Sequence, residues 1–308
     1  NDRLSTPKEF NIAISADWGC SASTKETVKN LQDKNPELVV AAGDLSYQEL
    51  TGNCWIEEII KPVENKTKIA FGDHDYIGIG EYRKPKQDYL AHFDLPRTYY
   101  SFDHENVHFL VMDPYAEYGI NSNQFKFVQD DLQLAYSNQS INWIFVVEHV
   151  PLYTSPAQHP ADSTIRDIYH PLFDKYGVDL VISGDNHNYQ RTFPLKYNYS
   201  NSNSSNPIIT DRNPTNYKGD YQGQIYLITG VGGRSLYELK GQAPFVVTQN
   251  DKHFGYIDIN IKGNNLEGSF YSNQVSVNEG RNNYTQVSVN EGRSNYTLID
   301  KFSISKDT

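Results

Sequence analysis

The chain has 308 residues, 38% of them hydrophobic and 13% aromatic, which is enough for one large domain with a substantial core. Its formal net charge is −11 and it has no Lys/Arg-rich block, so a nucleic-acid partner is not expected. No apolar run reaches the roughly 20 residues of a membrane-spanning helix, so no membrane span is expected either.

The first half of the chain alternates strand patterns with helix patterns. The predicted elements are strands at 11–16, 38–42, 68–71, 143–147 and 178–183, helices at 24–33, 55–63, 124–136 and 165–176, and a β-hairpin at 99–113. Strands that alternate with helices are typical of βαβ units, in which helices cover a central sheet.

The second half is richer in strand patterns. Residues 197–221 are rich in Asn, Ser, Pro and Tyr without any period, which predicts a long loop. Strands are predicted again at 224–229, 253–261 and 266–272. No linker separates the two halves, so we expect one domain of two packed sheets over residues 1–272 and a C-terminal β extension over 273–308.

The extension holds a tandem repeat. Residues 274–285 and 286–297 match at eleven of twelve positions, and each copy contains the turn sequence Asn-Glu-Gly-Arg. The unit is too short for a solenoid. It is either a local duplication that lengthened a hairpin, or a strand that pairs with a partner or with another copy of the chain.

Five short segments each follow a predicted strand. They are 16–19 (Ala-Asp-Trp-Gly), 43–47 (Gly-Asp-Leu-Ser-Tyr), 72–75 (Gly-Asp-His-Asp), 146–149 (Val-Val-Glu-His) and 184–187 (Gly-Asp-Asn-His). Loops at the carboxyl ends of strands in α/β sheets converge on one crevice. Each segment alone is unspecific, but together their carboxylates, imidazoles and phenol predict a site for one or two metal ions.

The order of these segments resembles the purple acid phosphatases of the calcineurin-like metallophosphoesterase superfamily, whose motifs are G-D-x-G, G-D-x-x-Y, G-N-H-D/E, V-x-x-H and G-H-x-H. Tyr47 corresponds to the residue that sets the purple type apart. The resemblance covers about residues 10–272. It implies a four-layer α/β/β/α sandwich of two mixed β-sheets, with the site at the strand ends.

The resemblance also implies ligands for two metals. Iron would be held by Asp17, Asp44, Tyr47 and His187. The second metal would share Asp44 and add Asp73, His149 and Asp185.

Two of these positions depart from the family, which has Asn where this chain has Asp73 and His where it has Asp185. Five anionic groups would then surround the metals, which weakens their Lewis acidity. Carboxylate in place of imidazole moves the second site from Zn towards Mn, Mg or Ca. Alternatively, Asp73 or Asp185 is protonated or points away.

The implied reaction is phosphoester hydrolysis, as in an acid phosphatase, in which a metal-bound hydroxide attacks phosphorus in line. His74 and His159 match the family's substrate-facing histidines and would stabilise the phosphoryl group or protonate the leaving group. The substrate would be a phosphorylated small molecule. Tyr189, Arg191 and Arg234 follow site loops and are expected to line the pocket mouth.

The competing hypothesis is a catalytically weak or inactive protein that keeps the fold and has an extracellular structural role, with assembly through the C-terminal strands. Six Asn-x-Ser/Thr sequons, where random placement would give about four, favour a secreted glycoprotein. The chain begins at Asn1 rather than Met, as a processed or trimmed form would. Cys20 and Cys54 form either a disulfide or a pair of buried free thiols.

Overall fold

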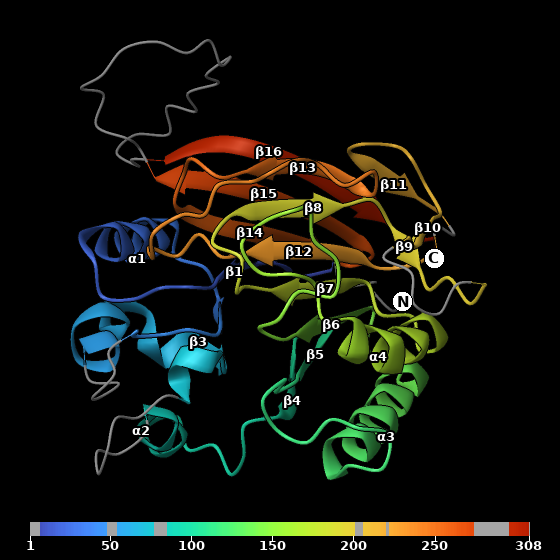
Figure 1. The fold of residues 1–308 in the computed structure, drawn as a ribbon, viewed down its shortest axis with the longest axis horizontal. Coiled ribbons are helices and arrows are strands. Elements are labelled where there is room, and N and C mark those ends of the chain that lie inside the picture. The colour runs from blue at the N-terminus through green and yellow to red at the C-terminus, as the bar shows by residue number, and fades with distance from the viewer. Residues whose placement is uncertain are drawn as a thin grey trace, which may run out of the picture.

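The structure is a computed structural model that describes residues 7–47, 54–76, 85–200, 206–219, 222–273 and 296–307. Two seven-stranded sheets, each with parallel and antiparallel pairs, lie face to face, and helices flank them (Figure 1). The predicted α/β fold with two mixed sheets and flanking helices is therefore confirmed.

The two sheets differ in where most of their parallel strands lie. The first has the order β11 (Asn216–Lys218), β16 (Tyr296–Ser305), β15 (Asn265–Asn273), β14 (Gly255–Lys262), β1 (Glu9–Ser15), β2 (Leu38–Ala42) and β3 (Thr67–Ala70). The second has the order β13 (Val246–Asn250), β8 (Tyr189–Thr192), β12 (Ile225–Thr229), β7 (Leu180–Ser183), β6 (Trp143–Val147), β5 (Val107–Val111) and β4 (Tyr100–His104). The parallel strands β1, β2 and β3 lie at one edge of the first sheet, whereas the parallel strands β5, β6, β7 and β12 lie in the middle of the second. A short pair joins β9 (Leu195–Lys196) to β10 (Ile208–Ile209).

The helices are α1 (Ala22–Lys34), α2 (Pro85–His92), α3 (Asn123–Ser137) and α4 (Ser163–Lys175). The predicted helix at 55–63 is instead a π-helical turn, Trp55–Ile59, followed by a 3₁₀ segment, Lys61–Lys66. Pro62 lacks a backbone N–H and stands at the start of the second segment, so a continuous α-helix cannot form there.

The predicted loop at 197–221 is partly wrong, because it contains β10 and β11. Both strands have only two or three residues, so neither carries a sequence period. The tandem repeat at 274–297 lies outside the described residues, apart from its last two positions, Tyr296 and Thr297, which begin β16. The boundary at 272/273 stays a prediction; β16 itself pairs with β15 inside the first sheet.

Buried strands form the core because both faces of each sheet are covered. All five residues of β2 are buried. Val40 and Ala42 pack between the sheets, whereas Val39 and Ala41 pack in the outer layer with residues of α1 such as Leu31. A parallel strand whose two faces are both covered is a continuous hydrophobic run in the sequence, which is why β2 could be predicted.

A buried ion pair joins the two sheets. Arg191 on β8 donates to both oxygens of Asp300 on β16, at 2.7 and 2.9 Å, and the Tyr189 hydroxyl donates to the same carboxylate at 2.7 Å. Arg191 and Tyr189 are each 1% exposed. The expectation that these two residues line the pocket mouth is therefore wrong, because their strand directs them into the core.

Asp300→Asn is expected to lower the free energy of unfolding by about 3 kcal/mol, because it leaves the buried guanidinium of Arg191 without its counter-charge. Chemical denaturation measures this loss. The matched control is Glu267→Gln, which removes an exposed ion pair with Lys301 on the neighbouring strand and should cost under about 1 kcal/mol. Equal losses in the two variants would contradict the assignment.

His108 links the hairpin edge to α3. Its Nδ1 lies 2.6 Å from Asp103 and its Nε2 lies 2.8 Å from Asp131. Burial lowers the pKa of His108, but the two carboxylates outweigh burial, so the pKa lies above its ordinary value of 6.5. The resulting stabilisation is complete below the unfolded-state pKa and is lost as the pH rises through the raised pKa.

His108→Gln is therefore expected to lower the free energy of unfolding more at about pH 6 than at about pH 9. Urea denaturation of both proteins at the two pH values measures the difference. A loss that is the same at both would mean that the charge of His108 contributes nothing.

Candidate metal centre

The five predicted segments follow β1, β2, β3, β6 and β7 and meet at one edge of the sandwich. The strands β1, β2 and β3 run parallel in the first sheet, and β6 and β7 run parallel in the second, so the carboxyl ends of each set lie together. The loops of the two sheets are in direct contact, because the backbone N–H of Asp185 donates to Asp17 Oδ2 at 3.0 Å. Residues from both sheets therefore form a single cluster.

Three predicted ligands converge on one side of the cluster. The Tyr47 hydroxyl donates to Asp17 Oδ1 at 2.7 Å and lies 2.8 Å from His187 Nε2, which is 3.2 Å from the same oxygen of Asp17. His187 Nδ1 donates to the carbonyl of Ser235 at 2.6 Å. This bond leaves the lone pair of Nε2 directed at the cluster, as a metal ligand requires.

His149 occupies the other side in the same manner. Its Nδ1 donates to the Ala42 carbonyl at 2.9 Å. Its Nε2 is buried, has no hydrogen-bond partner among the described residues, and lies 3.5, 3.8 and 3.9 Å from Asp44, Asp73 and Asp17. A buried imidazole nitrogen that faces three carboxylates without a partner fits a metal ligand.

Asp73 and Asp185 both face the cluster. Three overlapping groups have ligand atoms within 4.8 Å of one another: Asp17, Asp44 and His149; Asp44, Asp73 and His74; and Asp73, His149 and Asp185. The alternative prediction that Asp73 or Asp185 points away from the cluster is therefore wrong. Asp44, Asp73 and His149 each belong to two of these groups, so the groups form one continuous cluster.

The electrostatics of the cluster call for a cation. Burial raises the pKa of Asp185 to about 6. Burial, then the neighbouring charges of Asp17 and Asp44, raise the pKa of Tyr47 far above its ordinary value. The carboxylates Asp17 and Asp44 are buried, and bound metal ions would supply positive charge that compensates them.

Four predicted ligands have an unusual backbone conformation. Asp17, Asp44, Tyr47 and Asp185 have φ of 58°, 53°, 55° and 64°. They account for four of the seven non-glycine residues with positive φ in the described ranges. Such strain collects at functional sites, where it aims side chains that relaxed loops would direct elsewhere.

Asp75, which was not among the predicted site residues, holds two of the loops together. Its carboxylate accepts from the backbone N–H groups of Asp44, Leu45 and Gly72 at 3.0, 3.0 and 2.9 Å. The Gly-Asp-His-Asp segment contained this residue, but nothing in the sequence distinguished a positioning carboxylate from a ligand. A Cβ on Gly72 would overlap the Asp44 carboxylate, so the loops cannot approach each other without glycine there.

His74 and His159 lie at the rim, each with a 40% exposed side chain. The His74 ring packs 4.3 Å from the ring of Tyr47. His159 Nδ1 lies 3.9 Å from Asp185, and its loop is fixed by Asn186, whose amide side chain accepts from the His159 N–H and donates to its carbonyl. Both imidazoles therefore lie beside the carboxylates of the cluster and are partly open to solvent.

Two further side chains contact Tyr47 and His187. The Arg234 guanidinium lies 4.6 Å from the ring centre of Tyr47, so its expected place near the mouth agrees with the structure. Tyr237 stacks on His187 with ring centres 3.9 Å apart. Tyr237 was missed because it lies in the loop between β12 and β13, outside the five motif segments.

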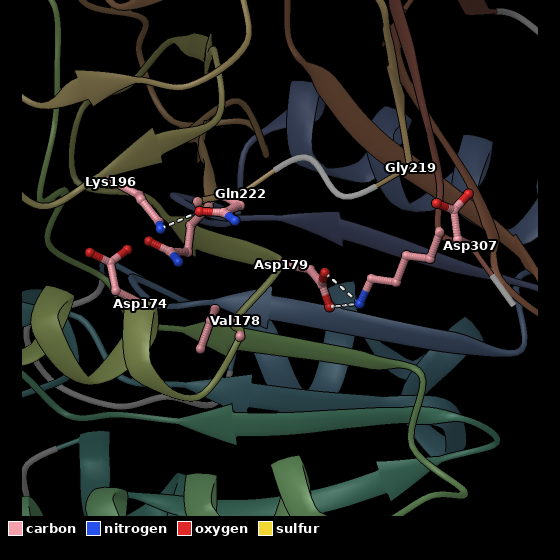
Figure 2. Close-up of a pocket in the computed structure, with 11 residues that line it drawn as sticks. Asp174, Val178, Asp179, Lys196, Gly219, Gln222 and Asp307 are labelled. Carbon is pink, nitrogen blue, oxygen red and sulfur yellow. Dashed lines mark hydrogen bonds and ion pairs between the residues drawn. The ribbon is translucent and has the colours of Figure 1, made fainter.

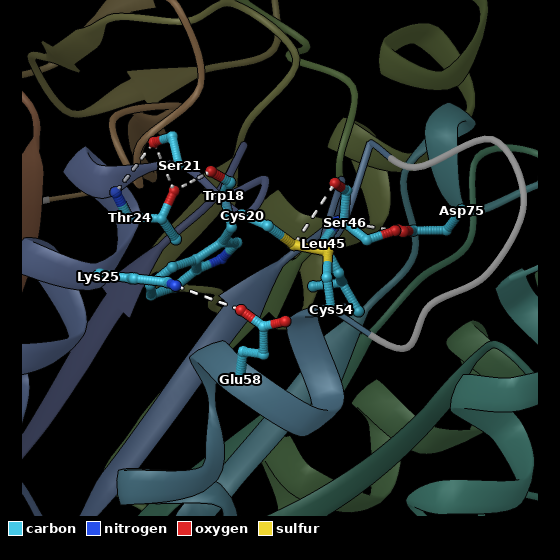
Figure 3. The surroundings of a disulfide bond; sticks show 10 residues. All are labelled: Trp18, Cys20, Ser21, Thr24, Lys25, Leu45, Ser46, Cys54, Glu58 and Asp75. Carbon is cyan, nitrogen blue, oxygen red and sulfur yellow. Dashed lines mark hydrogen bonds and ion pairs between the residues drawn. A yellow bond between two sulfur atoms is a disulfide. The ribbon is translucent and has the colours of Figure 1, made fainter.

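Cys20 and Cys54 form a disulfide beside the site (Figure 3). The bond ties the loop after β1 to the start of the π-helical turn, and Cys20 Sγ lies 3.9 Å from the carbonyl of Ser46. The open choice between a disulfide and free thiols is thereby decided. A cavity of about 540 Å³ lies away from the cluster, where Asp179 precedes β7 and pairs with Lys306 (Figure 2).

Similarities to known proteins bear on the family and the fold of the chain. The family model described as calcineurin-like phosphoesterase matches residues 10–189. Purple acid phosphatase 15 of Arabidopsis thaliana is 25% identical, over 75% of this chain and 46% of its own length. The Fe(3+)-Zn(2+) purple acid phosphatase 12 of the same plant is 26% identical, over 82% of this chain and 57% of its own length.

A purple acid phosphatase from yellow lupin seeds has a similar fold, with a TM-score of 0.77 at 21% identity, over 98% of this chain and 54% of its own. The chain spans about half the length of the curated relatives it matches. Within the described part of the chain, no helix is long and apolar enough to cross a membrane.

Proposed function

The chain belongs to the calcineurin-like phosphoesterase family, and from this premise we propose that it is a metal-dependent hydrolase of small-molecule phosphate esters, similar to acid phosphatases. The observation that carries the proposal is the buried, unpartnered Nε2 of His149 amid three carboxylates. The acid phosphatase relatives support it as well.

The donor set suits two metal ions. Asp17, Asp44, Tyr47 and His187 would hold iron, since phenolate and carboxylate oxygens with one imidazole suit it. The second ion would be held by Asp44 together with Asp73, His149 and Asp185, a set rich in oxygen that suits Mn, Mg or Ca and admits Zn. When bound, the ions would supply Lewis acidity and lower the pKa of water.

Side chains of the protein would bind the phosphoryl group, protonate the leaving group and position the ligand loops. His74 and His159 would donate hydrogen bonds to phosphoryl oxygens from the two sides of the cluster, and one of them would protonate the leaving group. The Asp185 carboxylate, 3.9 Å from His159 Nδ1, would orient that imidazole. Asp75 would hold the loops of Asp44 and Asp73 in a fixed relative position, because its carboxylate accepts three hydrogen bonds from their backbone N–H groups.

The test is turnover of p-nitrophenyl phosphate by protein loaded in turn with Mn, Fe, Zn and Ca across a range of pH. Turnover that depends on the metal is expected. Activity that is equal in metal-free and metal-loaded protein, or no activity with any metal, would contradict the proposal.

A second candidate is a weakly active or inactive protein of the same fold with an extracellular structural role. The two additional carboxylates, Asp73 and Asp185, favour it, because a neutralised metal pair attracts a phosphate dianion less. Secretion is in keeping with the disulfide, since such bonds persist in oxidising compartments. Purification as a filament or a homo-oligomer held by the C-terminal strands would support this candidate.

A further inference from the structure

A second opening adjoins the metal cluster. This cavity of about 280 Å³ is lined by three loops: residues 18–21 after β1, residues 46–47 after β2, and residues 233–235 after β12. Tyr47 forms part of its wall and part of the cluster, so the two spaces share a boundary. Among the described lining residues Arg234 is the one cation and none is acidic. The cavity therefore has the opposite charge character from the cluster beside it.

The Arg234 loop is fixed to the predicted ligands. The backbone N–H of Arg234 donates to the Asp17 carbonyl at 2.9 Å, and the carbonyl of Ser235 accepts from His187 at 2.6 Å. On the other side, the Ser21 hydroxyl donates to the Gly233 carbonyl at 3.0 Å. The position of Arg234 relative to the cluster is therefore set by the same bonds that orient the ligands.

Gly233 lets this loop approach the start of α1. It has φ of 153°, and a Cβ there would overlap Thr24. The guanidinium of Arg234 extends over the ring of Tyr47 rather than to an acid, and it has no carboxylate partner in the described part of the chain. Its hydrogen-bond donors are consequently available to a ligand that enters the cavity.

We infer that the Arg234 cavity is a subsite for a second phosphoryl group of the substrate, so that the substrates are esters with two or more phosphate groups. The inference rests on the proposed function of the adjoining site. A guanidinium presents a planar fork that matches phosphate oxygens with two hydrogen bonds. The cation also attracts a highly charged substrate, which a metal pair neutralised by five anionic groups would attract less.

The test uses non-hydrolysable probes, so that it does not depend on turnover. Calorimetry would compare the binding of methylphosphonate with that of alkane bisphosphonates whose linkers run from one to four carbons, on metal-loaded protein. At least one bisphosphonate is expected to bind about tenfold or more tightly than methylphosphonate. Arg234→Gln should remove this gain, and Arg234→Lys should restore only part of it.

Arg212→Gln is the matched control, because Arg212 is exposed in the loop before β11 and lines no part of the cavity. It should keep the full gain. No gain for any bisphosphonate on the wild-type protein, or a gain that survives in Arg234→Gln, would overturn the inference. A protein that shows the gain but hydrolyses no ester would uphold the subsite and reject the proposed function, so the two failures are distinguishable.

Discussion

Asp44→Asn is expected to lower the turnover of p-nitrophenyl phosphate by at least about 10³-fold and to reduce the number of metal ions retained per chain. Asp44 is the ligand that the family resemblance assigns to both metals, and it belongs to two of the three ligand groups, so its loss should weaken both metal positions at once. Steady-state kinetics and elemental analysis of the same preparations measure the two effects together.

The control is Asp130→Asn, which makes the same chemical change on the exposed face of α3. Its turnover and metal content should equal those of the wild-type protein. Retention of both metals and of most activity in Asp44→Asn would show that the hydrolysis occurs elsewhere.

The double variant Asp73→Asn/Asp185→His is expected to raise turnover with zinc by about tenfold or more. It restores the donor types that the resemblance assigns to these positions and reduces the anionic groups from five to three. Less neutralised metals polarise a phosphoryl oxygen more strongly, and an added imidazole favours zinc. Turnover and zinc retention, each measured with Zn and with Mn, test both parts.

The single variants serve as controls for this pair. Asp185→His alone should gain zinc affinity, whereas Asp73→Asn alone should mainly reduce negative charge. A double variant that retains zinc and yet is no more active than the wild-type protein would contradict the proposal that the negative charges of Asp73 and Asp185 limit turnover by neutralising the metals.

The sequence predicted those parts of the fold whose side chains carry a period or a continuous apolar run. β2 was found because all its residues are buried and apolar, and the alternation of strands and helices predicted βαβ units, whereas the pair of mixed sheets was implied by the family resemblance. Strands such as β11, β8 and β13 were missed because they are short, or because their partners lie far away in the sequence. Pro62 divided a predicted helix that the hydrophobic pattern alone had joined.

The sequence predicted which residues gather at the candidate site but not the backbone conformations that direct their side chains. Motif order brought together Asp17, Tyr47 and His187, whereas the positive φ values that aim three of the ligand loops leave no mark on the sequence. The sequence likewise could not separate Arg191, which is buried against Asp300, from Arg234, which is exposed beside Tyr47. Both arginines follow site loops, and only the direction of the backbone after each loop distinguishes them.

The most direct test of the account is a titration of metal-free protein with iron and then with a divalent ion, with turnover recorded at each step. We predict that activity rises with bound metal and levels off at two ions per chain, that His149→Ala loses one of the two ions, and that Asp44→Asn weakens the binding of both. Turnover that is already maximal before metal is added, or two bound ions without any turnover, would contradict the claim that this cluster is a metal-dependent phosphoesterase site.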